Sequence, residues 1–259
     1  SDDAFDRLVE QLLASPQYGE RMAVYWLDLV RYADTVGYHG DQTQNISPYR
    51  DWVINSFNSN QRFDDFTRDQ LAGDLGSSPT TAQRIATGYN RLLQTTHEGG
   101  LQVKEYRAIY AADRVRNVSA VWMGATVGCA QCHDHKFDPY TARDFYSLSA
   151  FFSDIDDEKH FTAGSNANPT ARDPELEVPT VEQQQQLREF EQVVESAKTE
   201  LKAEGLSEAE KTVLQGSIRK FESKIKQLRS TLRRTMITVA LDQPRGVRVL
   251  PRGNWLDET

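Results

Sequence analysis

The sequence predicts a mostly α-helical fold, in which an irregular multi-helix domain carries an inserted antiparallel helical hairpin. Apolar residues recur at the three- and four-residue spacing of amphipathic helices through most of residues 1–155. The alternating pattern of strands is confined to residues 236–250, where we expect one or two short strands. The 11 Phe, 10 Tyr and 4 Trp supply enough aromatic surface for a core, although the formal net charge is −8.

The first region, residues 1–155, is predicted to hold most of the helices. Pro16 follows Ser15 and interrupts the first periodic stretch, so this stretch is expected to form two helices. Gly and Pro mark residues 34–48 as a loop. We expect helices at residues 4–33 (with that break), 48–58, 63–74, 80–94, about 102–127 and 141–153.

The remaining residues divide into three regions. Residues 156–180 are rich in Pro, Gly and Asn and are predicted to form a linker or long surface loop. Residues 181–234 are nearly free of Gly and Pro, and Gly205 followed by a capping box at Ser207 divides them into the two arms of a hairpin. Its charged surface favours a solvated, coiled-coil-like spacer over a docking arm for a partner. Residues 235–259 are expected to lead into a further domain of a longer protein.

Composition excludes some functions and leaves the compartment open. No apolar run approaches the ~20 residues of a membrane-spanning helix, so no transmembrane segment is expected. The acidic balance argues against nucleic acid as a partner, because such binding needs a basic surface. The first residues, Ser1-Asp2-Asp3, lack the basic and apolar regions of a signal peptide. The compartment must therefore be inferred from chemistry.

One motif carries recognisable chemistry. Residues 128–139 read Gly-Cys-Ala-Gln-Cys-His-Asp-His-Lys-Phe-Asp-Pro, and Cys-x-x-Cys-His is the attachment signature of c-type haem. Cys129 and Cys132 are spaced to form thioethers with the two vinyl groups of the porphyrin. The adjacent His133 is then the proximal ligand of the haem iron. The motif therefore predicts a covalent haem c cofactor.

Three other interpretations of this motif remain open. The two cysteines could form a redox-active pair, or they could be buried structural thiols. Alternatively, a structural Zn²⁺ site could use Cys129, Cys132 and His135. The fourth zinc ligand would be one of His39, His97 and His160.

The motif, with Asp144-Phe145-Tyr146 and Ala150-Phe151-Phe152 after it, resembles the planctomycete cytochrome c-associated domain of unknown function (PSCyt type). The resemblance covers about residues 4–155, and the tail at 252–256 is similar to the start of the family domain that usually follows. Further similar stretches are Ser15–Arg21, Trp26–Asp28, Arg31–Asp34, Tyr49–Ile54, Asp69–Leu75, Glu98–Gly100, Glu105–Arg107 and Asp113–Val115. The resemblance implies a large secreted or periplasmic protein. Its partners would be a redox partner or other domains of the same polypeptide.

The sequence also offers candidates for the other contacts of a haem. A second axial ligand gives an electron carrier, whereas an open iron face gives ligand binding or catalysis. His97 precedes the long helix and is the candidate distal ligand. His135 lies too close in sequence to His133 to reach the opposite haem face, so we expect it to bind a propionate or line the pocket. Met123 is expected to fill space in the core.

Charged residues around the start of the long helix suggest a second kind of site. Arg114 is a candidate partner of a haem propionate. Glu98 and Asp113 are candidate catalytic acid and base groups. The alternative is an internal salt-bridge network. Asp28 and Arg31, three residues apart, are expected to form an intrahelical ion pair.

Two weaker sites are also suggested by residue type. Aromatic and acidic groups in or beside the glycine-containing loop would suit a carbohydrate ligand; these are Tyr38, Asp41, Tyr49 and Trp52. Asp134 and Asp138 could contribute to a calcium site, although two carboxylates are few for that ion.

The sequence therefore predicts a secreted or periplasmic c-type haem protein with a redox role. That role is electron transfer, or haem-assisted oxidation of an extracellular substrate such as a carbohydrate, in which case the chain is a haem-dependent oxidoreductase. A haem-free module with structural zinc and a polysaccharide-active enzyme with paired carboxylates are the alternatives.

Overall fold

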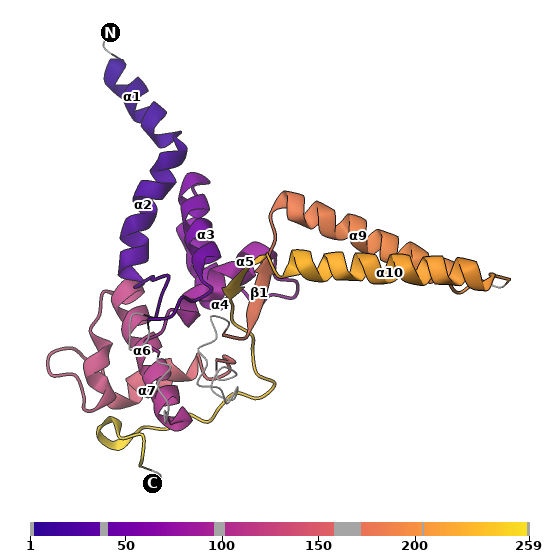
Figure 1. The fold of residues 1–259 in the computed structure, drawn as a ribbon. Coiled ribbons are helices and arrows are strands. Elements are labelled where there is room, and N and C mark those ends of the chain that lie inside the picture. The colour runs from indigo at the N-terminus through magenta and orange to yellow at the C-terminus, as the bar shows by residue number, and fades with distance from the viewer. Residues whose placement is uncertain (1–2, 37–40, 96–101, 158–171, 204, 258–259) are drawn as a thin grey trace. The chain divides into compact units, whose positions relative to one another are not determined.

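A computed structural model describes residues 3–36, 41–95, 102–157, 172–203 and 205–257. The chain forms two compact units. Unit 1 comprises residues 1–176 and 235–259, and unit 2 comprises residues 177–234. The predicted mostly helical fold is confirmed (Figure 1). Within the described ranges, no helix is both long enough and apolar enough to cross a membrane.

Unit 1 contains most of the helices, and α2 and α3 lie side by side in it (Figure 1). Ser15 caps α2 by accepting a hydrogen bond from the Gln17 N–H, and Pro16 occupies the first helical turn, so the predicted break is confirmed. Among its described residues, the helices of unit 1 are α1 (Ala4–Leu13), α2 (Pro16–Leu29), α3 (Ser47–Asn58), α4 (Phe63–Ala72), α5 (Thr81–Ala86), η1 (Thr87–Arg91), α6 (Val103–Met123), η2 (Val127–Gln131), α7 (Ala142–Ala150) and η3 (Pro251–Gly253).

The main core of unit 1 is built where α2, α3, α4 and α6 meet. Tyr49 is fully buried, and its hydroxyl lies 2.6 Å from Gln70 Oε1, to which the Trp26 indole N–H also donates. Trp52 stacks on Phe66 in the same core, with ring centroids 5.1 Å apart. Tyr49 and Trp52 therefore offer no surface to a sugar, which corrects that part of the carbohydrate hypothesis. Asp41 is exposed, and Tyr38 lies outside the described residues.

A second apolar cluster joins α6, η2 and α7. Val115 of α6 and Phe145 of α7 are almost completely buried, together with Val127 and Ala130 of η2. This packing positions the cysteine motif, because η2 is anchored by two apolar side chains that flank its first cysteine in the sequence.

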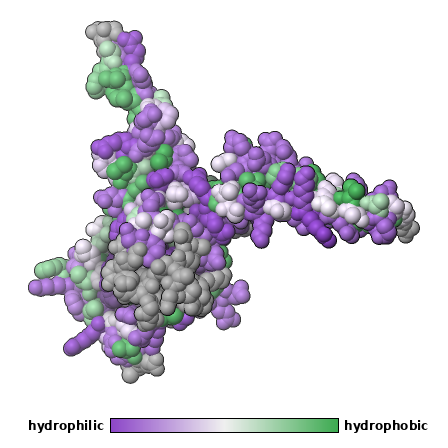
Figure 2. All heavy atoms as spheres, in the orientation of Figure 1, coloured by the Kyte–Doolittle hydropathy of each residue, from purple (hydrophilic) through white to green (hydrophobic). Residues whose placement is uncertain are grey.

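α1 contrasts with these packed helices. None of its residues is buried, and its apolar side chains form a hydrophobic patch at one end of unit 1 (Figure 2). The exposed side chains are Phe5, Leu8, Leu12 and Leu13.

Unit 2 is the predicted antiparallel hairpin, which is confirmed. It consists of α9 (Val181–Glu200) and α10 (Glu208–Arg229), and Thr180 and Ser207 each open a helix with a capping box. Phe190 contacts Phe221 across the hairpin at 5.6 Å between ring centroids.

The chain enters and leaves the hairpin through a two-stranded antiparallel sheet. Its strands are β1 (Glu175–Val178) and β2 (Arg233–Met236). The strand prediction at 236–250 is correct only at its first residue. The rest of that segment has no named strand and pairs with Ile155 through an isolated bridge at Ala240. β1 was not predicted from the sequence.

Candidate functional site

The end of α6 directs the chain into the cysteine motif. Gly124 adopts φ 59°, a left-handed conformation that favours glycine and ends the helix at Met123 rather than at the predicted residue 127. The chain then turns directly into η2. Met123 is exposed, so its predicted place in the core is wrong. Met123 is the last residue of α6, and a residue in the last turn of a helix can lie beyond the core that covers the earlier turns.

Cys129 and Cys132 lie on one tight turn. The Cys132 N–H donates to the Cys129 carbonyl at 3.4 Å, as expected for a 3₁₀ helix. Because a 3₁₀ helix has three residues per turn, side chains three positions apart are eclipsed. Both thiols therefore lie on the same side of the turn. Both are exposed and free, so the interpretation of buried structural thiols is wrong.

His133 extends this exposed face with an oriented imidazole. Its Nδ1 lies 2.8 Å from the Asp134 carbonyl oxygen. A carbonyl can only accept, so Nδ1 carries the ring proton and Nε2 of the neutral ring keeps its lone pair. Metal-binding histidines commonly show this arrangement, in which one ring N–H donates to a carbonyl while the other nitrogen binds the metal.

His135 has a different role, because both of its ring nitrogens are used within the loop. Nδ1 accepts hydrogen bonds from the backbone N–H groups of Phe137 (3.2 Å) and Asp138 (2.8 Å). The ring proton is therefore on Nε2, which lies 3.1 Å from Thr126 Oγ1. The His135 backbone N–H also donates to the Tyr140 carbonyl at 2.7 Å. His135 holds the loop that carries His133.

The described residues do not bring together the ligands of the predicted zinc or calcium site. In the part of the chain that the structure describes, no group of three His, Cys, Asp or Glu residues is placed to hold a metal ion. Asp134 instead accepts a hydrogen bond from the Ala142 N–H at the start of α7 (2.8 Å). The remaining zinc-ligand candidates lie outside the described residues; they are His39, His97 and His160. His97 was also the candidate distal haem ligand.

The C-terminal segment packs against the cysteine turn, and sequence reasoning missed this contact. Gly253 has φ 70°, and a Cβ at this position would lie 3.0 Å from the Cys132 sulfur. The Tyr146 hydroxyl of α7 donates to the Gln131 carbonyl at 3.0 Å. Glycine at 253 therefore permits a close approach to Cys132. Apart from the glycine itself, nothing in the sequence indicated this contact.

Asp113 is part of an internal ion pair. It is 3% exposed, and its two oxygens accept hydrogen bonds from the Arg31 guanidinium at 2.7 and 3.2 Å. It also accepts from the Gln94 N–H at 3.2 Å. These contacts of Asp113 match the predicted internal salt-bridge network, which was the alternative to a catalytic acid–base role. The expected Asp28–Arg31 helical pair is wrong, because α2 ends at Leu29 and Arg31 pairs with Asp113 instead. Glu98, the other proposed carboxylate, lies outside the described residues.

Arg114, next to Asp113, points into a second buried network. Its guanidinium lies 2.6 Å from Asp157 Oδ2, and both side chains are 4% exposed. It also donates twice to the Asn90 carbonyl, at 3.1 and 3.0 Å. Burial alone would raise the pKa of Asp157, but the guanidiniums of Arg114, Arg245 and Arg91 outweigh burial and hold the pKa below its ordinary value.

Arg91 is a buried cation that the sequence did not identify. It donates to the carbonyl oxygens of Arg172 (2.9 Å), Pro174 (3.2 Å) and Ile237 (2.8 Å). Complete burial lowers its pKa to about 10. Arg91 therefore joins the segments that precede β1 and follow β2 to the domain core.

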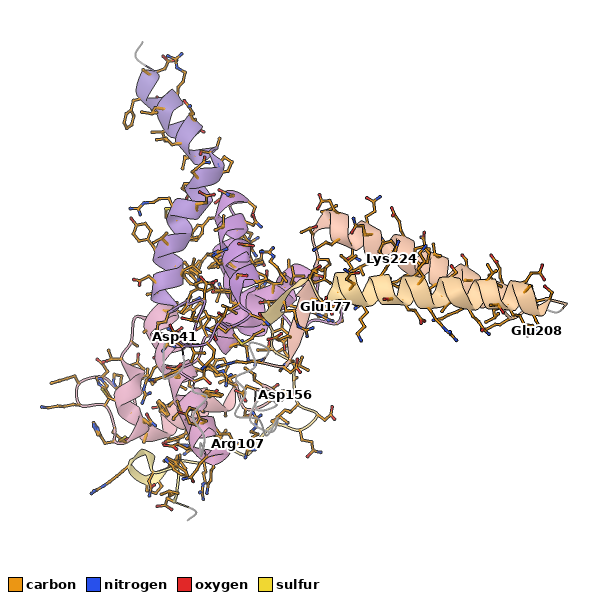
Figure 3. All side chains as sticks on the ribbon, in the orientation of Figure 1. Asp41, Arg107, Asp156, Glu177, Glu208 and Lys224 are labelled. Atoms are coloured by element: carbon orange, nitrogen blue, oxygen red, sulfur yellow. The ribbon has the colours of Figure 1, made fainter. Side chains whose placement is uncertain are left out.

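A cavity of about 400 Å³ lies beside the cysteine turn. It is bounded by α6, by η2 through Gln131, by α7 and by residues 245–255. Figure 3 labels one of its lining residues, Arg107, which comes from α6. Cys129, Cys132 and His133 are not among its lining residues.

The fold and motif together define a helical domain that presents a Cys-x-x-Cys-His turn at its surface. The chain belongs to the PSCyt2 family, described as a protein of unknown function (DUF1549), whose family model matches residues 1–157. The predicted family resemblance is therefore confirmed. No curated protein and no solved structure gave a significant match.

Proposed function

We propose that this chain is a secreted or periplasmic c-type haem protein with a redox role, with Cys129 and Cys132 as covalent anchors and His133 as the proximal ligand. One observation carries the proposal: the two thiols lie exposed on the same side of one turn, and the next residue is a histidine whose Nε2 keeps its lone pair. When bound, haem would supply an iron that gains and loses one electron.

The donor chemistry of the motif fits this cofactor. Each thioether forms when a cysteine S–H adds across a vinyl double bond: the sulfur bonds to one carbon and the hydrogen goes to the other, so no oxidant is needed. This addition requires thiols that are free and accessible, as both are here. An iron ligand requires a free ring nitrogen, which the hydrogen bond between His133 Nδ1 and the Asp134 carbonyl leaves at Nε2.

His135 acts as a positioning residue in this proposal. By accepting the N–H groups of Phe137 and Asp138 it fixes the loop that begins at His133. A rigid loop reduces the conformational freedom that would be lost when the imidazole binds iron. The second axial position stays assigned to His97 as a prediction. The redox partner, the substrate and the role of other domains are likewise proposals.

Expression with cytochrome c maturation factors in an oxidising compartment tests the proposal. We expect the purified chain to stain for haem after denaturing electrophoresis, and the Cys129→Ser/Cys132→Ser variant to lose the stain. His133→Ala should keep covalent haem but change the visible spectrum of the iron. Lys136→Gln, an exposed change in the same loop, is the matched control and should behave like the wild type.

Two results would contradict the haem proposal. A colourless product with one equivalent of zinc would support the structural zinc alternative. Turnover of a glycan by the haem-free chain, lost in Asp113→Asn and Glu98→Gln, would support the paired-carboxylate alternative.

A further inference from the structure

The two sides of the α9–α10 hairpin are covered to different extents. On one side, two ion pairs join the helices: Lys198 Nζ lies 3.2 Å from Glu222 Oε1, and Arg229 Nη2 lies 3.1 Å from Glu191 Oε1. Glu191 and Lys198 are seven residues apart, as are Glu222 and Arg229, so both ion pairs lie on the same side of the hairpin. Charged side chains therefore already cover this side.

A groove of about 490 Å³ lies on the other side of the hairpin, between the two helices. Val193 and Glu200 line it, and each comes just before an apolar residue of the helix contact. Glu191 and Lys198 instead come just after such a residue. In a heptad pattern these two kinds of position flank the helix contact on opposite sides. No ion pair crosses the groove among the described residues of unit 2.

The apolar residues along the groove are incompletely covered. No residue of α10 is buried, and Leu214, which lines the groove, is only partly buried. Val193 is 38% exposed, and Val213, one turn before the lining residue Ser217, is 71% exposed. Helical bundles bury such surfaces by packing further helices against them. The groove therefore suits a helical occupant with an apolar face.

The charges of the two helices indicate which occupant fits. α9 has five acidic and two basic residues, a formal charge of −3, whereas α10 has three acidic and six basic residues, a formal charge of +3. Glu189 lines the groove from α9, and Lys220, three residues after Ser217, lies on the corresponding face of α10. Neither Glu189 nor Lys220 forms an ion pair with a described residue. A complementary occupant presents a basic helix beside an acidic one, as this hairpin itself does.

We propose that the groove is the interface of a homodimer, in which the hairpins of two copies pack face to face as a four-helix bundle. A two-fold axis parallel to the helices places α9 of each copy against α10 of the other, so that oppositely charged helices meet. Phe190 contacts Phe221 across the hairpin, so their sequence neighbours Glu189 and Lys220 lie at the same level. Glu189 of each copy then faces Lys220 of the other. The hairpin is thus a docking arm rather than the solvated spacer that its charge pattern favoured.

Sedimentation velocity of the full chain over a series of micromolar concentrations tests the homodimer. We expect a reversible equilibrium between monomer and dimer. Val193→Asp should weaken the dimer about a hundredfold or more, because it places an unpaired charge in the interface twice. Val181→Asp is the matched control, since Val181 belongs to the same helix, is 78% exposed and does not line the groove. Circular dichroism shows whether each variant keeps its helices.

A charge exchange tests whether the partner is a second copy of this chain. Glu189→Lys and Lys220→Glu should each weaken self-association about tenfold, because two pairs of like charge then face each other in the dimer. An equimolar mixture of the two variants should regain the dimer, because both facing pairs of the mixed dimer join opposite charges. Both positions are exposed, so neither substitution is expected to disturb the fold.

The same dimer is expected in Cys129→Ser/Cys132→Ser, so failure of the haem proposal would leave this one standing. A wild-type chain that stays monomeric at every concentration would overturn the proposal in favour of a helix from a different protein. Equal effects of Val193→Asp and Val181→Asp, or no recovery in the mixture of charge variants, would overturn it as well.

Discussion

Two groups of polar residues, one within α6 and one just after it, differ in burial. Asp113 and Arg114, in the middle of α6, are buried and paired with Arg31 and Asp157. The Cys-x-x-Cys-His turn beyond the end of α6 is exposed, and neither of its thiols is in a disulfide. In the sequence, both groups were candidates for catalysis or for cofactor binding. The first group holds distant segments together, whereas the second is exposed to solvent.

The difference shows what burial does to a charged residue. A buried ion must be neutralised by a partner, and once neutralised it is less able to act on anything else. An exposed thiol or imidazole needs no such partner. Substitutions in the buried network, and then in the exposed turn, test this contrast.

The largest effect is expected from Arg114→Met, which leaves the Asp157 carboxylate buried without its closest cation. Breaking a buried ion pair by removing one partner lowers the free energy of unfolding by about 3–5 kcal/mol. Urea unfolding at pH 7 measures this. Arg68→Met removes an exposed pair with Asp65 and should cost about 1 kcal/mol or less. Equal losses in the two variants would show that the buried pair has no special role.

A smaller effect is expected from Asp157→Asn, because the amide oxygen can still accept a hydrogen bond from Arg114. The pKa of Asp157 is lowered by folding, so its charge stabilises the protein above the ordinary aspartate pKa. That contribution is lost as the pH falls through the lowered value. Urea unfolding from pH 7 to pH 3 should show the two proteins converging in acid. A constant difference at every pH would contradict this assignment.

His135→Phe tests the exposed turn by removing the acceptor for two backbone N–H groups. We expect local opening of the loop to become easier by about 1–2 kcal/mol, with global unfolding affected less. Hydrogen exchange followed by mass spectrometry should show faster exchange at Phe137 and Asp138. Lys136→Gln is the control within the same loop. Unchanged exchange would mean that the ring does not hold the loop.

The smallest effect is expected from Gly253→Ala, which places a methyl group against the Cys132 sulfur. The left-handed backbone adds strain of about 1 kcal/mol. Alkylation with iodoacetamide, read by mass spectrometry, should slow at Cys132 more than at Cys129. Gly76→Ala, where a Cβ would meet nothing within 4 Å, should leave both rates unchanged. Equal slowing at both thiols would contradict the predicted contact.

Local patterns predicted local structure well. The break at Pro16 and the hairpin both depend on residues close together in sequence, and helix signals are of that kind.

Long-range pairings could not be predicted in the same way. Arg31 binds Asp113, and Arg91 binds the Ile237 carbonyl 146 residues away. No periodicity connects such positions. Met123 shows the same limit, since its exposure depends on where α6 ends relative to the core. The contact between Gly253 and Cys132 likewise required the folded chain.

Arg91 has a consequence for how this architecture can vary. By donating to carbonyls just before β1 and just after β2, it fastens the two chain segments that flank the hairpin to the domain core. The residues of unit 1 on either side of the insertion are therefore held to one another within unit 1. A change in the length of the hairpin should therefore cost unit 1 little, because loop-closure entropy grows only slowly with length.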